Sequence, residues 1–155
     1  MFFKKKKEEP VQQEKKQLLY RENIQVGCKA DTQENVIRKV GQMLVDTGYV
    51  DQPYVEAMIE REKSFSTYMG NELALPHGVE AAKKEIKASG IAVMVFPEGT
   101  QWGKEIVKIV IGIAGVGEEH LEILGVIADK MLAADSVEKI VNGDVDTVYN
   151  MLSGN

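Results

Sequence analysis

Two histidines are the residues best suited to chemistry in this chain of 155 residues, which contains no others. Imidazole is the side chain that gains or loses a proton close to neutral pH. His77 lies in Leu75-Pro76-His77-Gly78, where proline restricts the backbone and glycine permits a close approach. This context is typical of an accessible imidazole on a rigid loop, and an inert surface histidine fits it equally well.

His120 stands near the start of a helix that the apolar pattern predicts over residues 118–133. Free backbone N–H groups at a helix start favour an anion, so a phosphoryl group would be well placed there between two imidazoles. Glu118 and Glu119 count against a standing anion site, and a histidine packed against the core is the alternative. Arg61, at the end of another predicted helix, has the donor geometry for phosphoryl oxygens, although most such arginines are solvated.

Other reactive motifs are weak. The glycine-rich run over 112–117 is neither a dinucleotide-binding motif nor a P-loop. Two histidines without H-E-x-x-H or a cysteine pair make a poor zinc site. Cys28 has no evident activating base and is expected to be a buried bystander. We therefore expect neither a cofactor nor a metal.

The composition excludes further classes. A net charge of −5 argues against nucleic-acid binding, which needs a basic face to displace counterions. The single cysteine cannot form an internal disulfide, which favours a reducing, cytoplasmic setting. No apolar run approaches the roughly 18 residues that span a bilayer. These features predict one soluble, acidic domain.

The charge is unevenly distributed, because residues 1–20 hold six lysines and three glutamates. This density predicts a flexible, solvated arm over residues 1–20 and a domain over 21–155. The alternative is a weak contact of the four lysines 4–7 with an anionic membrane surface.

Strand-like and helix-like segments alternate from residue 22 onward. Nearly continuous aliphatic runs over 91–96 and 106–114 are typical of central strands, the first closed by the turn Pro97-Glu98-Gly99. Helices are predicted from Asp31, as a cap, to Gly48 and from Pro53 to about Ser64. Further predicted elements are a strand over 23–29, an apolar stretch over 72–75, helical character over 79–87, and helices over 136–142 and 144–152.

This alternation predicts an α/β fold: a mixed β-sheet of about five strands sandwiched between helices, with the site along one edge of the sheet. The inner stripe of the helix over 118–133 is expected to comprise Leu121, Leu124, Ala128, Met131 and Leu132. The chain's only tryptophan, Trp102, is expected in a loop, as an interaction anchor or a local cap.

Several sequence blocks also carry a family resemblance. Three of them occur in order, Ala57-Met-Ile-Glu-Arg-Glu-Lys63, Thr67-Tyr-Met-Gly-Asn71 and Leu75-Pro-His-Gly78. Shorter blocks are Arg21-Glu-Asn-Ile24, Gly48-Tyr-Val50, Ser89-Gly-Ile91, Pro97-Glu-Gly99, Gly112-Ile-Ala-Gly115 and Glu119-His120. From about residue 21 onward the chain resembles the EIIA component of the bacterial phosphoenolpyruvate-dependent sugar phosphotransferase system, mannitol/fructose type, with the mannitol-specific branch fitting best.

The resemblance implies a phosphocarrier. It assigns His77 as the phosphorylated nucleophile, with His120 and Arg61 stabilising the phosphoryl group and its charge. The implied donor is phospho-HPr and the implied acceptor is a cysteine of the EIIB domain of a sugar permease, so contact with a membrane is indirect. Phosphoryl transfer asks a protein mainly for positioning and for hydrogen-bond donors around the spreading charge, which suits these residue types.

Two alternatives and one departure accompany this hypothesis. A fructose-type EIIA performs the same chemistry with another permease, and a nitrogen-related regulatory EIIA binds targets according to its phosphorylation state. Asn71 stands where some mannitol relatives have an acidic residue, so no role is assigned to it. For partner docking we expect an apolar rim formed by Met69, Val79 and the loop of Trp102.

Overall fold

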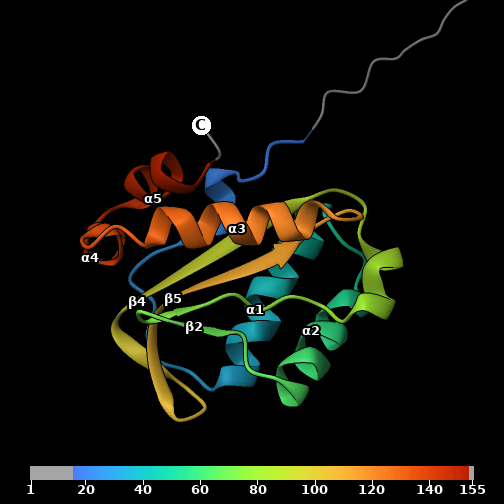
Figure 1. The fold of residues 1–155 in the computed structure, drawn as a ribbon, viewed down its shortest axis with the longest axis horizontal. Helices are drawn as coiled ribbons and strands as arrows, with labels where there is room; N and C mark the ends of the chain where they lie inside the picture. The colour runs from blue at the N-terminus through green and yellow to red at the C-terminus, as the bar shows by residue number, and fades with distance from the viewer. Residues whose placement is uncertain (1–15, 154–155) are drawn as a thin grey trace, which may run out of the picture.

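The structure, a computed structural model, describes residues 16–153. Helices and strands alternate along this range, as Figure 1 shows. In chain order the elements are η2 (Arg21–Asn23), β1 (Ile24–Gln25), α1 (Gln33–Asp46), α2 (Pro53–Ser64), β2 (Tyr68–Gly70), β3 (Leu73–Ala74), η3 (Glu80–Glu85), β4 (Gly90–Trp102), β5 (Glu105–Ala114), α3 (Glu119–Met131), α4 (Ser136–Val141) and α5 (Val145–Leu152), where η denotes a 3-10 helix.

The strands form one mixed sheet in the order β1-β4-β5-β3-β2. Its centre is the antiparallel pair β4 and β5, in which Ile91 lies opposite Ile113. β1 runs parallel to β4 and β3 runs parallel to β5, whereas β2 is antiparallel to β3. The predicted mixed sheet of five strands is confirmed. Because β3 and β5 are parallel, the segments that follow them leave from the same end of the sheet.

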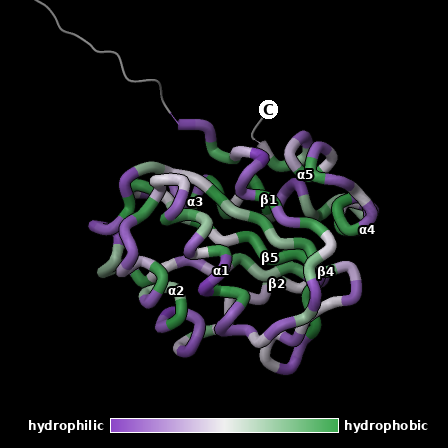
Figure 2. The backbone as a smooth tube through the Cα atoms, turned by 180° about the vertical axis from the view of Figure 1, so that it is seen from behind, coloured by the Kyte–Doolittle hydropathy of each residue, from purple (hydrophilic) through white to green (hydrophobic). Residues whose placement is uncertain are grey.

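Helices cover both faces of this sheet, α1 and α2 on one side and α3, α4 and α5 on the other (Figure 1). Successive residues of β4 therefore enter two different apolar cores. The core under α1 and α2 takes Ala92, Met94 and Phe96, and the opposite core takes Ile91, Val93 and Val95. Burial on both faces explains the nearly continuous aliphatic runs, which Figure 2 shows as hydrophobic strands between more hydrophilic loops.

The expectation that Pro97-Glu98-Gly99 closes a strand is wrong, because β4 continues to Trp102. The pairing with β5 shifts between Val95 and Thr100, so the three residues form an irregularity inside the strand. Gly99 has a φ of +83°, which a bulge and a turn both accommodate. Trp102 is consequently a strand residue with 1% exposure, and not an exposed loop anchor.

The first strand and the first helix differ from prediction by small amounts. β1 has two residues and not the seven of 23–29, and Gly27 has a φ of +64° just beyond it. The helix cap is Thr32 and not Asp31, since the Thr32 hydroxyl accepts a hydrogen bond of 3.2 Å from the Asn35 N–H. Asp31 accepts the Thr32 N–H at 2.7 Å instead.

The predicted bounds of α2 are confirmed: it begins at Pro53 and ends at Ser64. The two short helices at the end of the domain are confirmed to within a residue or so, as α4 and α5. The helical character predicted over 79–87 is the 3-10 helix η3, and β2 was not predicted.

The predicted inner stripe of α3 is wrong at two of its five residues, whereas Met131 is buried and Leu124 packs against the core as expected. Ile123, Ile127 and Met131 face the core, whereas Leu121 is 59% exposed and Leu132 is 79% exposed. The helix carries two adjacent apolar stripes, and only one of them is buried.

Residues 1–15 of the predicted arm lie outside the described residues, and residues 16–20 contact the domain. Leu19 is fully buried, and the Leu18 carbonyl accepts a hydrogen bond of 2.9 Å from the Ile91 N–H. Among the described helices, none combines the length and apolar character that a bilayer crossing requires.

Candidate functional site

His77 lies just beyond β3, beside the end of β5. Its segment continues the parallel pairing with β5: His77 forms a bridge with Ile113, whose N–H donates to the Pro76 carbonyl at 2.9 Å. The site therefore lies where two inner strands, β3 and β5, reach one edge of the sheet.

One nitrogen of the His77 ring is already used within its own loop. Nδ1 lies 2.8 Å from the carbonyl oxygen of Leu75, which can only accept, so Nδ1 carries the proton and donates it. The neutral ring therefore keeps the lone pair of Nε2 available. Burial lowers the pKa of His77 below its usual value; the bond to Leu75 opposes this shift, and the positive charge of Arg61 adds to it. The geometry thus maintains a neutral imidazole with a nucleophilic Nε2 at neutral pH.

Tyr54 of α2 holds the residue after His77. Its hydroxyl donates to the Ile113 carbonyl at 2.8 Å and accepts from the Gly78 N–H, also at 2.8 Å. The ring leaves no space for a side chain at residue 78, since a Cβ there would lie 2.5 Å from Tyr54 Cε1. Burial raises the pKa of Tyr54 to about 12, so the hydroxyl remains a donor. Sequence reasoning missed this residue, which no motif marked.

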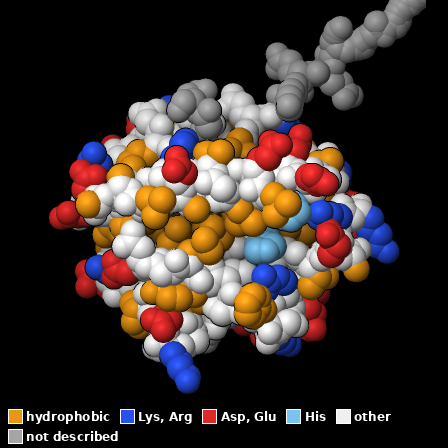
Figure 3. Space-filling model, in the orientation of Figure 1, with side chains coloured by type: hydrophobic (Ala, Val, Ile, Leu, Met, Phe, Trp, Pro, Cys, Tyr) orange, Lys and Arg blue, Asp and Glu red, His pale blue; other side chains and the backbone are white. Residues whose placement is uncertain are grey.

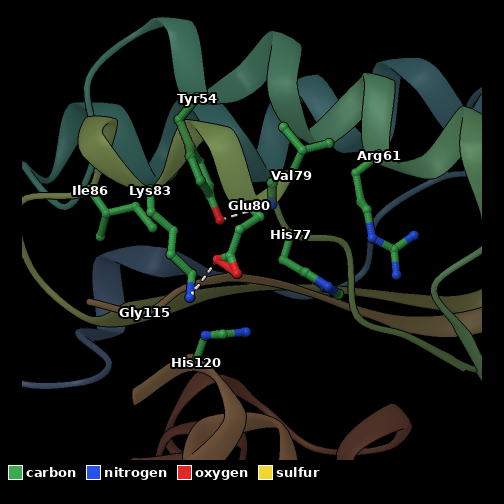
Figure 4. Close-up of a pocket in the computed structure, with 10 residues that line it drawn as sticks. Tyr54, Arg61, His77, Val79, Glu80, Lys83, Ile86, Gly115 and His120 are labelled. Carbon is green, nitrogen blue, oxygen red and sulfur yellow. Dashed lines mark hydrogen bonds and ion pairs between the residues drawn. The ribbon is translucent and has the colours of Figure 1, made fainter. Parts of the chain in front are cut away.

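His120 approaches the same space from the opposite side. Figure 4 shows it extending from the start of α3 toward His77. Its Nδ1 lies 3.2 Å from the Gly117 carbonyl oxygen and is again the protonated nitrogen. The loop over residues 115–118, between β5 and α3, packs closely against the start of α3. A Cβ on Gly115 would lie 2.3 Å from the His120 backbone. Ser89 fixes the loop further, because its Oγ accepts the Val116 N–H at 2.9 Å.

Arg61 reaches the site from the last turn of α2 (Figure 4). Its Nη1 donates to the Phe65 carbonyl at 2.5 Å, and its guanidinium carbon lies 5.4 Å from the centre of the Phe65 ring. Guanidinium offers five N–H donors, so one bond to a carbonyl leaves others for an anion. His77, His120 and Arg61, the three residues chosen from the sequence, are brought together.

A buried carboxylate supports this end of α2. Glu62 accepts three hydrogen bonds, from the Thr67 N–H at 2.7 Å, the Thr67 hydroxyl at 2.6 Å and the Trp102 indole N–H at 2.9 Å. With three donors the buried group is well satisfied. The segment that follows Arg61 is thereby fixed to β4. Sequence reasoning assigned no role to Glu62.

The three residues line one pocket of about 160 Å³. Sites for small molecules typically measure roughly 300–1,000 Å³, so this pocket suits a transferred group better than a free metabolite. Ten residues surround it: Tyr54, Arg61, His77, Gly78, Val79, Glu80, Lys83, Ile86, Gly115 and His120.

Other residues discussed from the sequence lie elsewhere. Asn71 belongs to the turn between β2 and β3, has a φ of +54°, and donates to the Met131 carbonyl at 3.2 Å, so it joins that turn to the end of α3. Cys28 is half-buried and burial raises its pKa, which disfavours the thiolate. Within residues 16–153 no cluster of side chains has the composition of a metal site.

An apolar surface adjoins the pocket. Figure 3 shows a band of hydrophobic side chains that runs across this face of the molecule to the two histidines. The large exposed hydrophobic residues of the molecule include Leu121 of α3, Leu132 just after that helix, Met69 of β2, and Phe65 beside Arg61. Met69 is 51% exposed, as the expected rim requires, and Val79 is half-buried at the pocket. Of the two alternatives for Trp102, the interaction anchor is wrong, because that side chain is buried against Glu62.

Comparisons with known proteins agree with this arrangement. The chain is 40% identical over 139 residues to the mannitol-specific phosphotransferase enzyme IIA component of Bacillus subtilis (strain 168), which covers 86% of this chain and 97% of the relative. The Escherichia coli complex of enzyme IIAMTL and phosphorylated enzyme IIBMTL contains a matching chain, with a TM-score of 0.83 and 37% identity over 88% of this chain and 98% of that chain.

A more distant structure shares the fold alone. The nitrogen regulatory protein IIA-Ntr from Neisseria meningitidis matches with a TM-score of 0.75 at 21% identity, over 87% of this chain and 96% of that chain. The family model described as "Phosphoenolpyruvate-dependent sugar phosphotransferase system, EIIA 2" matches residues 17–155. The chain therefore belongs to the EIIA type-2 family of the phosphoenolpyruvate-dependent sugar phosphotransferase system.

Proposed function

We propose that this chain is a phosphocarrier that accepts a phosphoryl group on His77 from phospho-HPr and passes it to the EIIB cysteine of a mannitol permease. One observation carries the proposal: the Leu75 carbonyl holds the Nδ1–H of His77, which leaves Nε2 as the nucleophile in a pocket shared with His120 and Arg61. The transfer takes place in the cytoplasm, where reduced thiols persist.

The hydrogen bond to Leu75 simplifies the chemistry. The lone pair of His77 Nε2 attacks phosphorus, the P–N bond in phospho-HPr breaks, and its electron pair returns to the HPr imidazole. In the second step the EIIB thiolate attacks, and the electron pair of the P–N bond returns to Nε2. The proton on Nδ1 stays against the Leu75 carbonyl throughout, so His77 leaves as the same neutral tautomer that entered.

Arg61 and His120 stabilise the negative charge on the phosphoryl oxygens. Arg61 has N–H donors beyond the one that it gives to Phe65. His120 uses Nδ1 for the Gly117 carbonyl, so it reaches a phosphoryl oxygen only through a protonated Nε2, as an imidazolium. Two cations on opposite sides of the group stabilise charge that spreads over its oxygens in the transfer state.

The apolar surface beside the pocket supports docking of both partners. Leu121, the residue after His120, and Met69 of β2 are more than half exposed, and hydrophobic side chains lie beside the two histidines (Figure 3). Since one imidazole must meet both the donor and the acceptor, HPr and EIIB use overlapping parts of this surface in turn. Each complex must dissociate quickly, which fits a small interface.

The assignment to mannitol is supported by the names of relatives at 40–45% identity. A fructose-type EIIA uses the same residues, and transfer assays with mannitol and fructose EIIB domains distinguish the two. The regulatory alternative is disfavoured by the low identity to IIA-Ntr. It becomes the better account should the chain pass its phosphoryl group to no sugar EIIB.

The test is phosphorylation with phosphoenolpyruvate, enzyme I and HPr, followed by intact mass under mildly basic conditions. The expected result is the gain of one phosphoryl group that is lost in acid, as a P–N bond requires, and no gain in His77→Ala with the fold retained by circular dichroism. A folded wild type that gains nothing from an active HPr overturns the proposal.

A further inference from the structure

Lys83 connects the segment that carries His77 to the loop that precedes α3 and His120. It belongs to η3, which begins three residues after His77. Its Nζ donates to the Gly117 carbonyl oxygen at 2.9 Å, across 34 residues of sequence. Gly117 in turn precedes His120 by three residues, and Lys83 lines the pocket itself.

The Gly117 carbonyl serves two donors at once. It accepts from Lys83 Nζ at 2.9 Å and lies 3.2 Å from His120 Nδ1. A carbonyl oxygen has two lone pairs, so both bonds are compatible. The direction of this carbonyl decides which nitrogen of His120 carries the proton and where Nε2 points.

Lys83 is itself held in place. Its Nζ forms an ion pair of 2.7 Å with Glu80, one turn earlier on η3, and its side chain is 29% exposed. Figure 4 shows this pair beside the pocket, between Tyr54 and His120. An ammonium with three N–H donors that already gives bonds to Glu80 and Gly117 is suited to fix a neighbour. It is less suited to be the main ligand of a phosphoryl group.

We propose that Lys83 is a positioning residue for phosphoryl transfer: it holds the Gly117 carbonyl, which accepts the Nδ1–H of His120 and so directs Nε2, protonated during the transfer, toward the phosphoryl group. The proposal rests on the phosphocarrier function, because it specifies how the second histidine of that site is oriented. Lys83 also links the placement of the two imidazoles, because His77 and Lys83 lie on one continuous segment of seven residues.

The kinetic test compares Lys83→Met with Lys84→Met, which removes the exposed lysine next to it on η3. In single-turnover phosphorylation by phospho-HPr, Lys83→Met lowers the maximal rate about tenfold, as expected for a misplaced catalytic group. The HPr concentration for half-maximal rate stays unchanged. Lys84→Met behaves as wild type, and Lys83→Arg recovers most of the rate because its guanidinium also donates to a carbonyl.

A spectroscopic test uses the unphosphorylated protein, so it does not depend on transfer. In wild type, ¹⁵N NMR of the imidazoles shows His120 with its proton on Nδ1 when the ring is neutral, and Lys83→Met shows a mixture of tautomers. Wild-type kinetics in Lys83→Met overturn the proposal. A changed half-saturating HPr concentration with an unchanged maximal rate does the same, since it assigns Lys83 to docking. An unaltered His120 spectrum also overturns it.

If the wild-type protein is not phosphorylated by phospho-HPr, the phosphocarrier function is refuted. The NMR comparison still tests whether Lys83 orients His120, because it uses the unphosphorylated protein. Should Lys83→Met fail to fold, Lys83→Gln takes its place, because it keeps a polar side chain of similar length at this partly exposed position.

Discussion

The hydroxyl of Tyr54 accepts a 2.8 Å hydrogen bond from the N–H of Gly78, so a residue of α2 holds the backbone next to His77. The same hydroxyl donates to Ile113, which pairs with His77. Three segments that are distant in sequence thus meet at one oxygen. The rigidity of the His77 loop comes from this contact as well as from the proline and glycine around it.

Tyr54→Phe should therefore lower both stability and transfer rate. The ring still packs against Gly78, but the Gly78 N–H and the Ile113 carbonyl lose their partner. An unsatisfied buried group costs about 1–3 kcal/mol, which urea denaturation measures. Tyr68→Phe is the control, since the Tyr68 hydroxyl makes no hydrogen bond to another described residue. Equal stability losses in the two variants would contradict the assigned role of Tyr54.

Gly115→Ala should displace His120. The added Cβ would lie 2.3 Å from the backbone N and Cα of His120. Backbone atoms cannot move aside as the end of a flexible side chain can. Overpacking of this kind costs about 1–3 kcal/mol, and the shift of α3 slows phosphorylation of His77. Thermal unfolding and single-turnover phosphorylation measure the two effects.

Gly125→Ala, on the helix that follows this loop, should have the opposite effect on stability. A Cβ at Gly125 meets nothing within 4 Å, and alanine is a better helix former than glycine by about 1 kcal/mol. This variant should gain stability. A Gly115→Ala protein that is as stable as wild type would show that the loop before α3 yields to the methyl group.

The sequence was sufficient for most of the fold because its signals are local. Pro53 marks the first residue of α2, and the aliphatic runs of β4 and β5 report burial on both faces. The errors occur where one local pattern fits two structures. Gly99 suits a turn or a bulge, and only the pairing with β5 decides between them. In α3, Leu121 lies on an apolar stripe that faces outward, and periodicity alone cannot distinguish a buried stripe from an exposed one.

The site residues also separate into those that local sequence signals identify and those that depend on distant contacts. His77, His120 and Arg61 were found from residue type, local context and family blocks, and they share one pocket. Glu62 and Lys83 were missed because their roles depend on partners 40 and 34 residues away. A charged residue on a helix reads as solvated unless its tertiary partners are known.

Arg61→Ala should keep the fold and slow transfer from phosphorylated His77 to EIIB about a hundredfold, the usual loss when one donor to a charged transfer state is removed. Half-buried Arg61 bonds to the carbonyl of exposed Phe65, so the structural loss is small. Quenched-flow kinetics with EIIB measure the rate. Arg38→Ala is the control, because Arg38 pairs with Glu34 and Glu56 and does not line the pocket. Unchanged transfer kinetics in Arg61→Ala would remove Arg61 from the mechanism.

The lowered pKa of His77 predicts a pH dependence of stability with a definite sign. Burial disfavours the protonated ring in the folded protein, whereas the unfolded chain takes up its proton near pH 6.5, the ordinary value for histidine. Between these two pKa values the unfolded state binds more protons, so the free energy of unfolding falls as the pH falls through this window. His77→Gln removes this contribution. Urea denaturation from about pH 7.5 to about pH 5 should therefore show a shallower loss of stability in His77→Gln than in wild type. Parallel curves would mean that folding leaves the protonation of His77 unchanged, and would contradict a neutral, buried imidazole at this position.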